Sequence, residues 1–209
     1  MTAHDMAKVI FEGVKSLKPK EDRTLIAIAG PPGSGKSTVA EIVANLMNEN
    51  LMKTSLVPMD GFHLDNKTLE RENLFDRKGA PETFDVKGFT ELIKKLRYKR
   101  NSSVPLFDRK LDEVVKNGRK ISSEQEYILI EGNYLLLNKD LWRDLYYYWD
   151  YKVFLSVDNS VLKSRLIQRW LNENHTYSEA ETRVIKNDLV NADVVNSNRL
   201  EATLELQTG

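Results

Sequence analysis

The chain has 209 residues, enough for one domain with a complete hydrophobic core. Hydrophobic residues make up 41% and charged residues 30%, a balance typical of folded proteins rather than disordered chains. The net charge is zero, so no overall positive field would attract nucleic acid or an anionic membrane. There is no cysteine, which excludes disulfides, thiolate zinc sites and cysteine nucleophiles.

No targeting or membrane segment is evident in the sequence. Residues 1–5 are polar and lack the apolar core of a secretory signal. No apolar run approaches the length that crosses a bilayer. We therefore expect a cytoplasmic protein that binds neither membrane nor nucleic acid. The sequence carries no feature that predicts an oligomeric state.

The first half of the chain alternates helix and strand patterns. Apolar residues recur at helical spacing over residues 6–17, which predicts an opening amphipathic helix. Residues 25–29 predict a short buried strand, and a Gly/Pro turn separates it from a second amphipathic helix over residues 39–47. Residues 54–59 predict the next strand. A polar, irregular segment follows over residues 61–84, where we expect a loop with one helical turn.

The alternation continues in the second half. Asp85 suits a helix cap, so we expect a helix from there to about residue 100. Residues 104–115 predict a strand or a hairpin that carries charge. Residues 127–130 and 152–157 predict two further buried strands.

Two helices are predicted after the last of these strands. One covers residues 160–173, and the other begins at Ser178, because Ser178 and Glu181 match a capping box. Alternating strands and helices indicate an α/β fold with a mainly parallel, five-stranded sheet covered on both faces. No internal repeat or linker divides the chain, so we expect a single domain over residues 1–209.

A phosphate-binding motif follows the first predicted strand. The segment GPPGSGKS, residues 30–37, fits G-x-x-x-x-G-K-[ST] at every fixed position, between a strand and a helix. Glycines let backbone N–H groups wrap an anion, and the helix N-terminus adds partial positive charge. Lys36 can reach the β- and γ-phosphates of ATP, and the Ser37 hydroxyl can ligate Mg²⁺. The residues predicted to bind the nucleotide are Gly30, Pro31, Pro32, Gly33, Ser34, Gly35, Lys36, Ser37 and Thr38.

The motif predicts a Rossmann-like, three-layer P-loop NTPase fold. The alternative is a Gly-rich turn that merely starts a helix, but such a turn does not need Lys-Ser at these two places. Phosphate binding alone does not distinguish a kinase from an ATPase switch.

Two acidic residues come directly after predicted strands. Asp60 follows residues 54–59, and Glu131 follows residues 127–130. Ligands of open α/β sheets lie beyond the carboxyl ends of the strands, so both carboxylates are expected near the nucleotide. We assign Asp60 as the group that takes the proton of an acceptor hydroxyl and Glu131 as a residue near Mg²⁺. The alternatives are a simple Asp-Gly turn and a strand exit.

Seven segments along the chain carry a resemblance to known proteins. They are GPPGSGKS (30–37), VPMDGFH (57–63), GAPETFD (79–85), VPLFDR (104–109), ILIEGNY (128–134), RLIQRW (165–170) and NDLVNA (187–192). Taken in order, these motifs resemble the phosphoribulokinase/uridine kinase/pantothenate kinase family, from about residue 25 to residue 192. The likeness is greatest to a subgroup of uridine kinase-like and fructose-transport-associated kinases.

The resemblance implies an ATP-dependent kinase that phosphorylates a hydroxyl of a small molecule, with a lid near residues 160–192. It implies that Asp60 is the catalytic aspartate. It also implies that Lys36 and the lid arginines Arg165 and Arg169 take part in catalysis. The two arginines are four residues apart and would share one helix face. A solvated basic face is the alternative. The residues implied to bind the acceptor are Asp60, His63, Phe84, Arg109 and Tyr134.

The acceptor itself stays open at this level. This chain resembles uridine kinases, which carry an acidic residue just before a proline in the segment that matches residues 79–85. Before that proline this chain has Gly79 and Ala80 instead. Pantothenate kinases match that segment better, but they place His and Tyr where this chain has Arg109 and Asp112. The charged residues over 108–113 favour a polar, hydroxyl-rich or anionic acceptor, and an exposed charged loop is the alternative.

We therefore predict a uridine kinase-like phosphotransferase acting on a small metabolite such as a nucleoside or sugar. A pantothenate-type alcohol kinase and a nucleotide-dependent ATPase or regulatory switch are the alternatives.

Overall fold

A computed structural model describes residues 1–18, 20–98 and 100–209. A five-stranded sheet with the order β2-β5-β1-β6-β7 forms its centre, and every neighbouring pair in it is parallel. The predicted α/β fold with a mainly parallel five-stranded sheet is therefore confirmed. The strands of this sheet are β1 (Thr24–Ala29), β2 (Thr54–Pro58), β5 (Tyr127–Gly132), β6 (Tyr151–Val157) and β7 (Leu204–Thr208).

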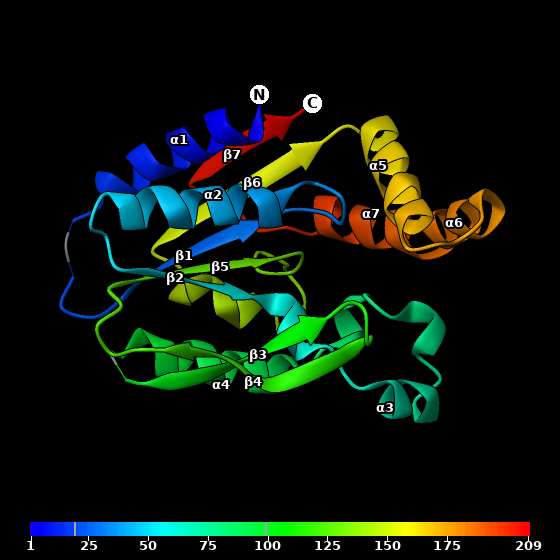
Figure 1. The fold of residues 1–209 in the computed structure, drawn as a ribbon, viewed down its shortest axis with the longest axis horizontal. Helices are drawn as coiled ribbons and strands as arrows, with labels where there is room; N and C mark the ends of the chain where they lie inside the picture. Colours follow the sequence, from blue (N-terminus) through cyan, green and yellow to red (C-terminus); the bar gives the residue numbers. More distant parts are fainter. Residues whose placement is uncertain (19, 99) are drawn as a thin grey trace.

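Helices cover both faces of the sheet, and β1 shows why (Figure 1). Its six residues are all buried, because alternate side chains enter different cores. Ile26 and Ile28 pack with residues of α1 (Ala3–Lys15) and α2 (Lys36–Glu49). Leu25, Ala27 and Ala29 pack with α4 (Val86–Arg97) and the segments around it.

A separate two-stranded hairpin lies beside the main sheet (Figure 1). It consists of β3 (Ser102–Asp108) and β4 (Glu113–Ile121), which pair antiparallel. The hairpin predicted over residues 104–115 is thus longer than expected.

A third, smaller core holds the last helices together beyond the carboxyl ends of the strands (Figure 1). It joins α5 (Asn159–Asn172), α6 (Tyr177–Arg183) and α7 (Leu189–Ser197), with a π-helical turn, η5 (Val184–Asp188), between the last two. Residues 160–192, which we call the lid segment, therefore pack mainly on one another.

Several boundaries differ from the sequence predictions. The fifth strand of the sheet, β7, was not predicted. The capping box belongs to Thr176 and Glu179, so the N-cap of α6 lies two residues before the predicted cap Ser178. The helix capped by Asp85 ends at Arg97 instead of about residue 100, and Lys99 lies outside the described residues.

The segment predicted to be a loop over residues 61–84 contains more helical structure than expected. It holds the end of η1 (Met59–Phe62), then α3 (Asn66–Arg71), η2 (Phe75–Arg77) and η3 (Pro81–Thr83). The remaining short helix of the chain's described part, η4 (Arg143–Tyr148), precedes β6.

Candidate active site

The phosphate loop (residues 30–37) connects β1 to α2. Gly33 and Gly35 have φ angles of 79° and 83°, in the left-handed region that glycine adopts without strain. Gly35 is the N-cap of α2 and supplies no side chain to cap it. The first N–H groups of the helix therefore remain available to an anion, as a phosphate-binding loop requires.

Lys36, Ser37 and Glu131 meet behind this loop. The Ser37 hydroxyl donates a hydrogen bond of 3.2 Å to Glu131 Oε2, and Glu131 is buried at the end of β5. Burial raises the pKa of Glu131, while the Lys36 charge lowers it. Burial lowers the pKa of Lys36, while Glu131 and Asp60 raise it. The hydroxyl and carboxylate are oxygen ligands of the kind that Mg²⁺ takes, so this pair fits the predicted ion.

Asp60 lies in η1, directly after β2. Sheet register explains its position, because Pro58 of β2 pairs with Glu131 of β5. Asp60 therefore follows at the same sheet edge, where its charge acts on the Lys36 ammonium. Arg109, in the turn of the β3–β4 hairpin, donates a 2.8 Å hydrogen bond to Asp60 Oδ2.

A cavity of ≈ 700 Å³ opens next to Asp60, and we call it the acceptor cavity. It lies between η1, α3 and the hairpin. Its lining residues are Gly61, Phe62, His63, Leu64, Asp65, Asn66, Lys67, Asp85, Pro105, Phe107, Asp112, Glu113, Val114 and Lys116.

His63 is an aromatic wall of the acceptor cavity. Its ring stacks on Phe84 with centroids 4.1 Å apart and lies 4.9 Å from the Phe107 ring. Burial lowers the pKa of His63 to about 4, so the ring is neutral at pH 7. Its Nδ1 atom is buried without a hydrogen-bond partner in the described structure.

The other two predicted acceptor residues lie behind this wall. Phe84 stacks on His63 and does not itself line the cavity, and the Tyr134 ring meets Phe84 edge-on with ring centroids 5.7 Å apart. Tyr134 is fully buried, and its hydroxyl donates a 2.6 Å hydrogen bond to the Gly79 carbonyl oxygen. Tyr134 is therefore better placed to support the wall of the acceptor cavity than to touch the acceptor directly.

Lys78 is a charged residue of this region that the sequence analysis did not single out. Its ammonium donates to Asn66 Oδ1 at 2.6 Å and to Asp112 Oδ1 at 2.7 Å, and it lies over the Phe107 ring. Burial raises the pKa of Asp112, but the hydrogen bonds from Lys78 and Asn66 lower it overall. In the sequence, only the position of Lys78 directly before the GAPETFD segment could have indicated that it belongs to the site.

The two predicted lid arginines have different partners, although both belong to α5. Arg165 donates to Thr208 Oγ1 at 3.0 Å and to the Gly209 carbonyl oxygen at 2.9 Å. Arg169 donates to Asp188 at 3.3 Å, keeps its buried Nε without a partner in the described structure, and acts electrostatically on Lys36. The difference arises because Arg165 bonds to Thr208 at the end of β7. The spacing of residues along the helix could not reveal this contact.

A known protein family matches most of this chain. The model of the phosphoribulokinase / uridine kinase family matches residues 25–192. The chain belongs to this family. A relative from Schizosaccharomyces pombe, described as a candidate uridine kinase, is 33% identical over 95% of this chain and 88% of its own length.

Similar solved structures and more distant relatives are also named as kinases. A candidate fructose transport system kinase from Silicibacter sp. TM1040 is 40% identical, covers 99% of both chains and has a TM-score of 0.91. A pantothenate kinase from Ligilactobacillus salivarius is 27% identical over 77% of this chain, which spans about half (52%) of that relative. The P-loop kinase fold and the prediction of a small-molecule kinase are thereby confirmed.

One further finding concerns the membrane. In the described part of the chain, no helix has both the length and the apolar character needed to cross a bilayer.

Proposed function

We propose that this kinase transfers the γ-phosphoryl group of ATP to a hydroxyl of a small polar metabolite bound in the acceptor cavity. One observation supports it above all: the Asp60 carboxylate acts electrostatically on Lys36, and the next residue in the chain, Gly61, lines the acceptor cavity. Phosphoryl transfer needs this proximity, because the attacking oxygen must meet the γ-phosphorus while its proton is accepted.

The nucleotide is assigned to the loop residues Gly30 to Thr38. The free N–H groups at the start of α2 bind the phosphates, and Lys36 supplies positive charge. Ser37 and Glu131 are the residues that would hold Mg²⁺, which when bound neutralises charge on the phosphates.

Asp60 acts as the proton acceptor. Arg109 bonds to its Oδ2 atom, which leaves Oδ1 for the acceptor hydroxyl. The hydroxyl proton passes to Asp60 and the hydroxyl oxygen bonds to the γ-phosphorus. The bond between that phosphorus and the bridging oxygen breaks, and ADP leaves with the electron pair.

Arg169 and Arg165 stabilise the transferring group when the lid segment closes and excludes water. The unpartnered Nε of Arg169 supports its part in this role. Arg165 would first have to leave Thr208 and Gly209.

The acceptor is assigned to the class of hydroxyl-rich metabolites, such as nucleosides or sugars. Charged and amide groups at the cavity, namely Lys78, Asp112 and Asn66, can exchange hydrogen bonds with several hydroxyls. The aromatic wall formed by His63 and Phe107 suits the apolar face of a sugar ring. The names of similar proteins, a candidate uridine kinase and a candidate fructose transport system kinase, fall within this class.

The test is ADP release from ATP·Mg²⁺ with uridine, D-fructose, pantothenate and ribulose 5-phosphate, each compared with no acceptor. We expect a nucleoside or sugar to raise the rate by about tenfold or more, because the bound hydroxyl replaces water as acceptor. The Lys36→Ala variant serves as the blank. Stimulation by pantothenate would favour the pantothenate-type enzyme. Steady hydrolysis that no compound stimulates would contradict the proposal and favour an ATPase switch.

A further inference from the structure

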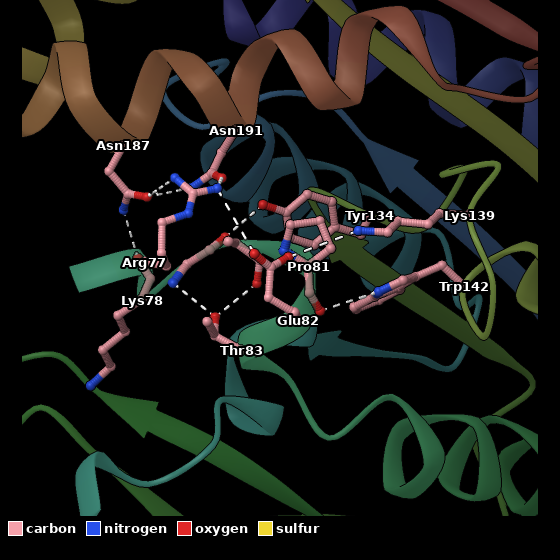
Figure 2. A network of polar contacts seen from close by, with 12 residues as sticks. Arg77, Lys78, Pro81, Glu82, Thr83, Tyr134, Lys139, Trp142, Asn187 and Asn191 are labelled. Carbon is pink, nitrogen blue, oxygen red and sulfur yellow. Dashed lines mark hydrogen bonds and ion pairs between the residues drawn. The ribbon is translucent and has the colours of Figure 1, made fainter. Parts of the chain in front are cut away.

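Arg77 links the loop behind the acceptor cavity to the lid segment (Figure 2). From η2 its guanidinium donates to Asn187 Oδ1 at 2.8 Å and to Asn191 Oδ1 at 3.3 Å. Both asparagines are buried while the Arg77 side chain is partly exposed, so these bonds are partly shielded from water. One side chain thus joins two segments more than a hundred residues apart in sequence.

Asn187 is held from a second side. Its amide nitrogen donates a 2.9 Å hydrogen bond to the Lys78 carbonyl oxygen, so its orientation is fixed by both a donor and an acceptor (Figure 2). It lies in η5, the π-helical turn. Such turns are rare and often occur at functional sites.

Asp188, the next residue in η5, connects this junction to Arg169. Its buried carboxylate accepts hydrogen bonds from Trp170 Nε1 at 2.6 Å and from Arg169 at 3.3 Å. Arg169 is the residue whose charge reaches Lys36 and whose Nε has no partner in the described structure.

The other end of the junction reaches the acceptor cavity. The Gly79 carbonyl oxygen accepts from the Tyr134 hydroxyl, and the Gly79 N–H donates to Thr83 Oγ1 at 3.0 Å (Figure 2). The chain then continues to Phe84, which stacks on His63. The loop that carries Arg77 is therefore anchored to the wall of the cavity.

From this chain of contacts we propose that Arg77 is a positioning residue, which through Asn187 and Asp188 aims the Arg169 guanidinium at the γ-phosphate. The proposal rests on the proposed function in one respect, the contact between Arg169 and the γ-phosphate. Arg77 does not touch the nucleotide. Its loss lets η5 and Asp188 shift, and Arg169 then loses the fixed orientation that a charge-assisted hydrogen bond needs.

The test compares affinities for two nucleotides in the presence of Mg²⁺. Calorimetry measures the dissociation constants of ADP and of the nonhydrolysable ATP analogue AMP-PNP, and their ratio isolates binding of the γ-phosphate. We expect Arg169→Met to reduce this preference for AMP-PNP by about tenfold, the size of one charge-assisted hydrogen bond. Arg77→Met keeps the aliphatic part of the side chain but removes the guanidinium that bonds both asparagines. It should reduce the preference for AMP-PNP over ADP by about fivefold.

The double variant Arg77→Met/Arg169→Met decides between positioning and general support. If Arg77 acts through Arg169, the double variant is no worse than Arg169→Met alone. The proposal would be overturned if the double variant lost as much preference for AMP-PNP as the product of the two single losses. It would also be overturned if the preference of Arg77→Met or of Arg169→Met stayed within about twofold of wild type. Arg71→Met is the matched control, since Arg71 is exposed and pairs with the adjacent Glu72; it should behave as wild type.

Melting curves check that each variant folds. Should Arg77→Met fail to fold, Arg77→Lys keeps the charge but cannot bond both asparagines at once, and it should fall between wild type and Arg169→Met. A preference in Arg77→Lys equal to that of wild type would overturn the proposal. The measurement needs no acceptor, so its outcome is independent of the ADP-release screen.

Discussion

At the scale of single residues, His63 and Asp60 show how neighbours in sequence acquire different properties. Asp60 keeps a partly exposed carboxylate that pairs with Arg109. His63 is enclosed by Phe84 and Phe107, and burial lowers its pKa to about 4. The aromatic wall of the cavity therefore stays uncharged beside the Asp60–Arg109 ion pair.

His63 should make folding stability sensitive to acid. Above pH 6.5 its ring is neutral in both the folded and the unfolded chain. As the pH falls from 6.5 towards 4, the unfolded chain takes up a proton that the folded chain refuses, so stability is lost in this window. At pH 5 the loss is about 2 kcal/mol.

Urea unfolding at pH 7.5 and pH 5 measures this effect. His63→Phe keeps a ring against Phe84 but cannot titrate. The free energy of unfolding should drop by about 2 kcal/mol more in wild type than in His63→Phe, while the carboxylates common to both cancel. Equal drops in the two proteins would show that His63 is not shielded as the structure describes.

At the scale of elements, the β3–β4 hairpin sets the position of Asp60. A Cβ atom on Gly61 would lie 2.1 Å from the Pro105 carbonyl oxygen, so η1 and β3 touch backbone to backbone at this point. Gly209 is different, because a Cβ atom there would meet no atom within 4 Å.

This difference predicts the outcome of a matched pair of variants. Gly61→Ala should lower the free energy of unfolding by about 3 kcal/mol, because main-chain atoms of β3 must move. It should also reduce transfer, since Asp60 is the adjacent residue. Gly209→Ala should change the free energy of unfolding by less than about 0.5 kcal/mol, because the added methyl group meets open space. Urea unfolding measures both, and a loss for Gly61→Ala no larger than that for Gly209→Ala would contradict the packing described here.

Elements with strong local patterns could be predicted from the sequence. The apolar run of residues 25–29, the motif of residues 30–37 and the cap at Asp85 each depend on neighbouring residues, and each lies where it was expected. The capping box was assigned two residues late because Ser178/Glu181 and Thr176/Glu179 both fit the pattern.

Elements that depend on distant partners could not be predicted. In β7, Leu204 and Leu206 alternate with polar residues, but five residues at a sheet edge give a weak signal until β6 pairs with them. The π-helical turn at residues 184–188 has no sequence signature that was recognised. Arg165 shows the same limit at the site, since helix spacing cannot reveal that the C-terminal residues bind it.

At the scale of the whole molecule, the candidate site is assembled by the topology of the sheet. β1, β2 and β5 are parallel neighbours, so the phosphate loop, Asp60 and Glu131 emerge at one edge although up to a hundred residues separate them. The hairpin and the lid segment then add Arg109 and Arg169 from either side. This is the arrangement that the proposed transfer to a hydroxyl requires, with ATP held apart from bulk water.

The central claim is that Asp60 accepts the proton of the attacking hydroxyl. The most direct test is kcat for transfer by Asp60→Asn, with the acceptor that the screen identifies, alongside AMP-PNP affinity as a measure of the intact phosphate loop. Because Asn keeps the size of the side chain but cannot take the proton, kcat should fall by about 10²–10⁴-fold while AMP-PNP affinity stays within about twofold of wild type. A kcat within about threefold of wild type would contradict the assignment of Asp60 as the general base.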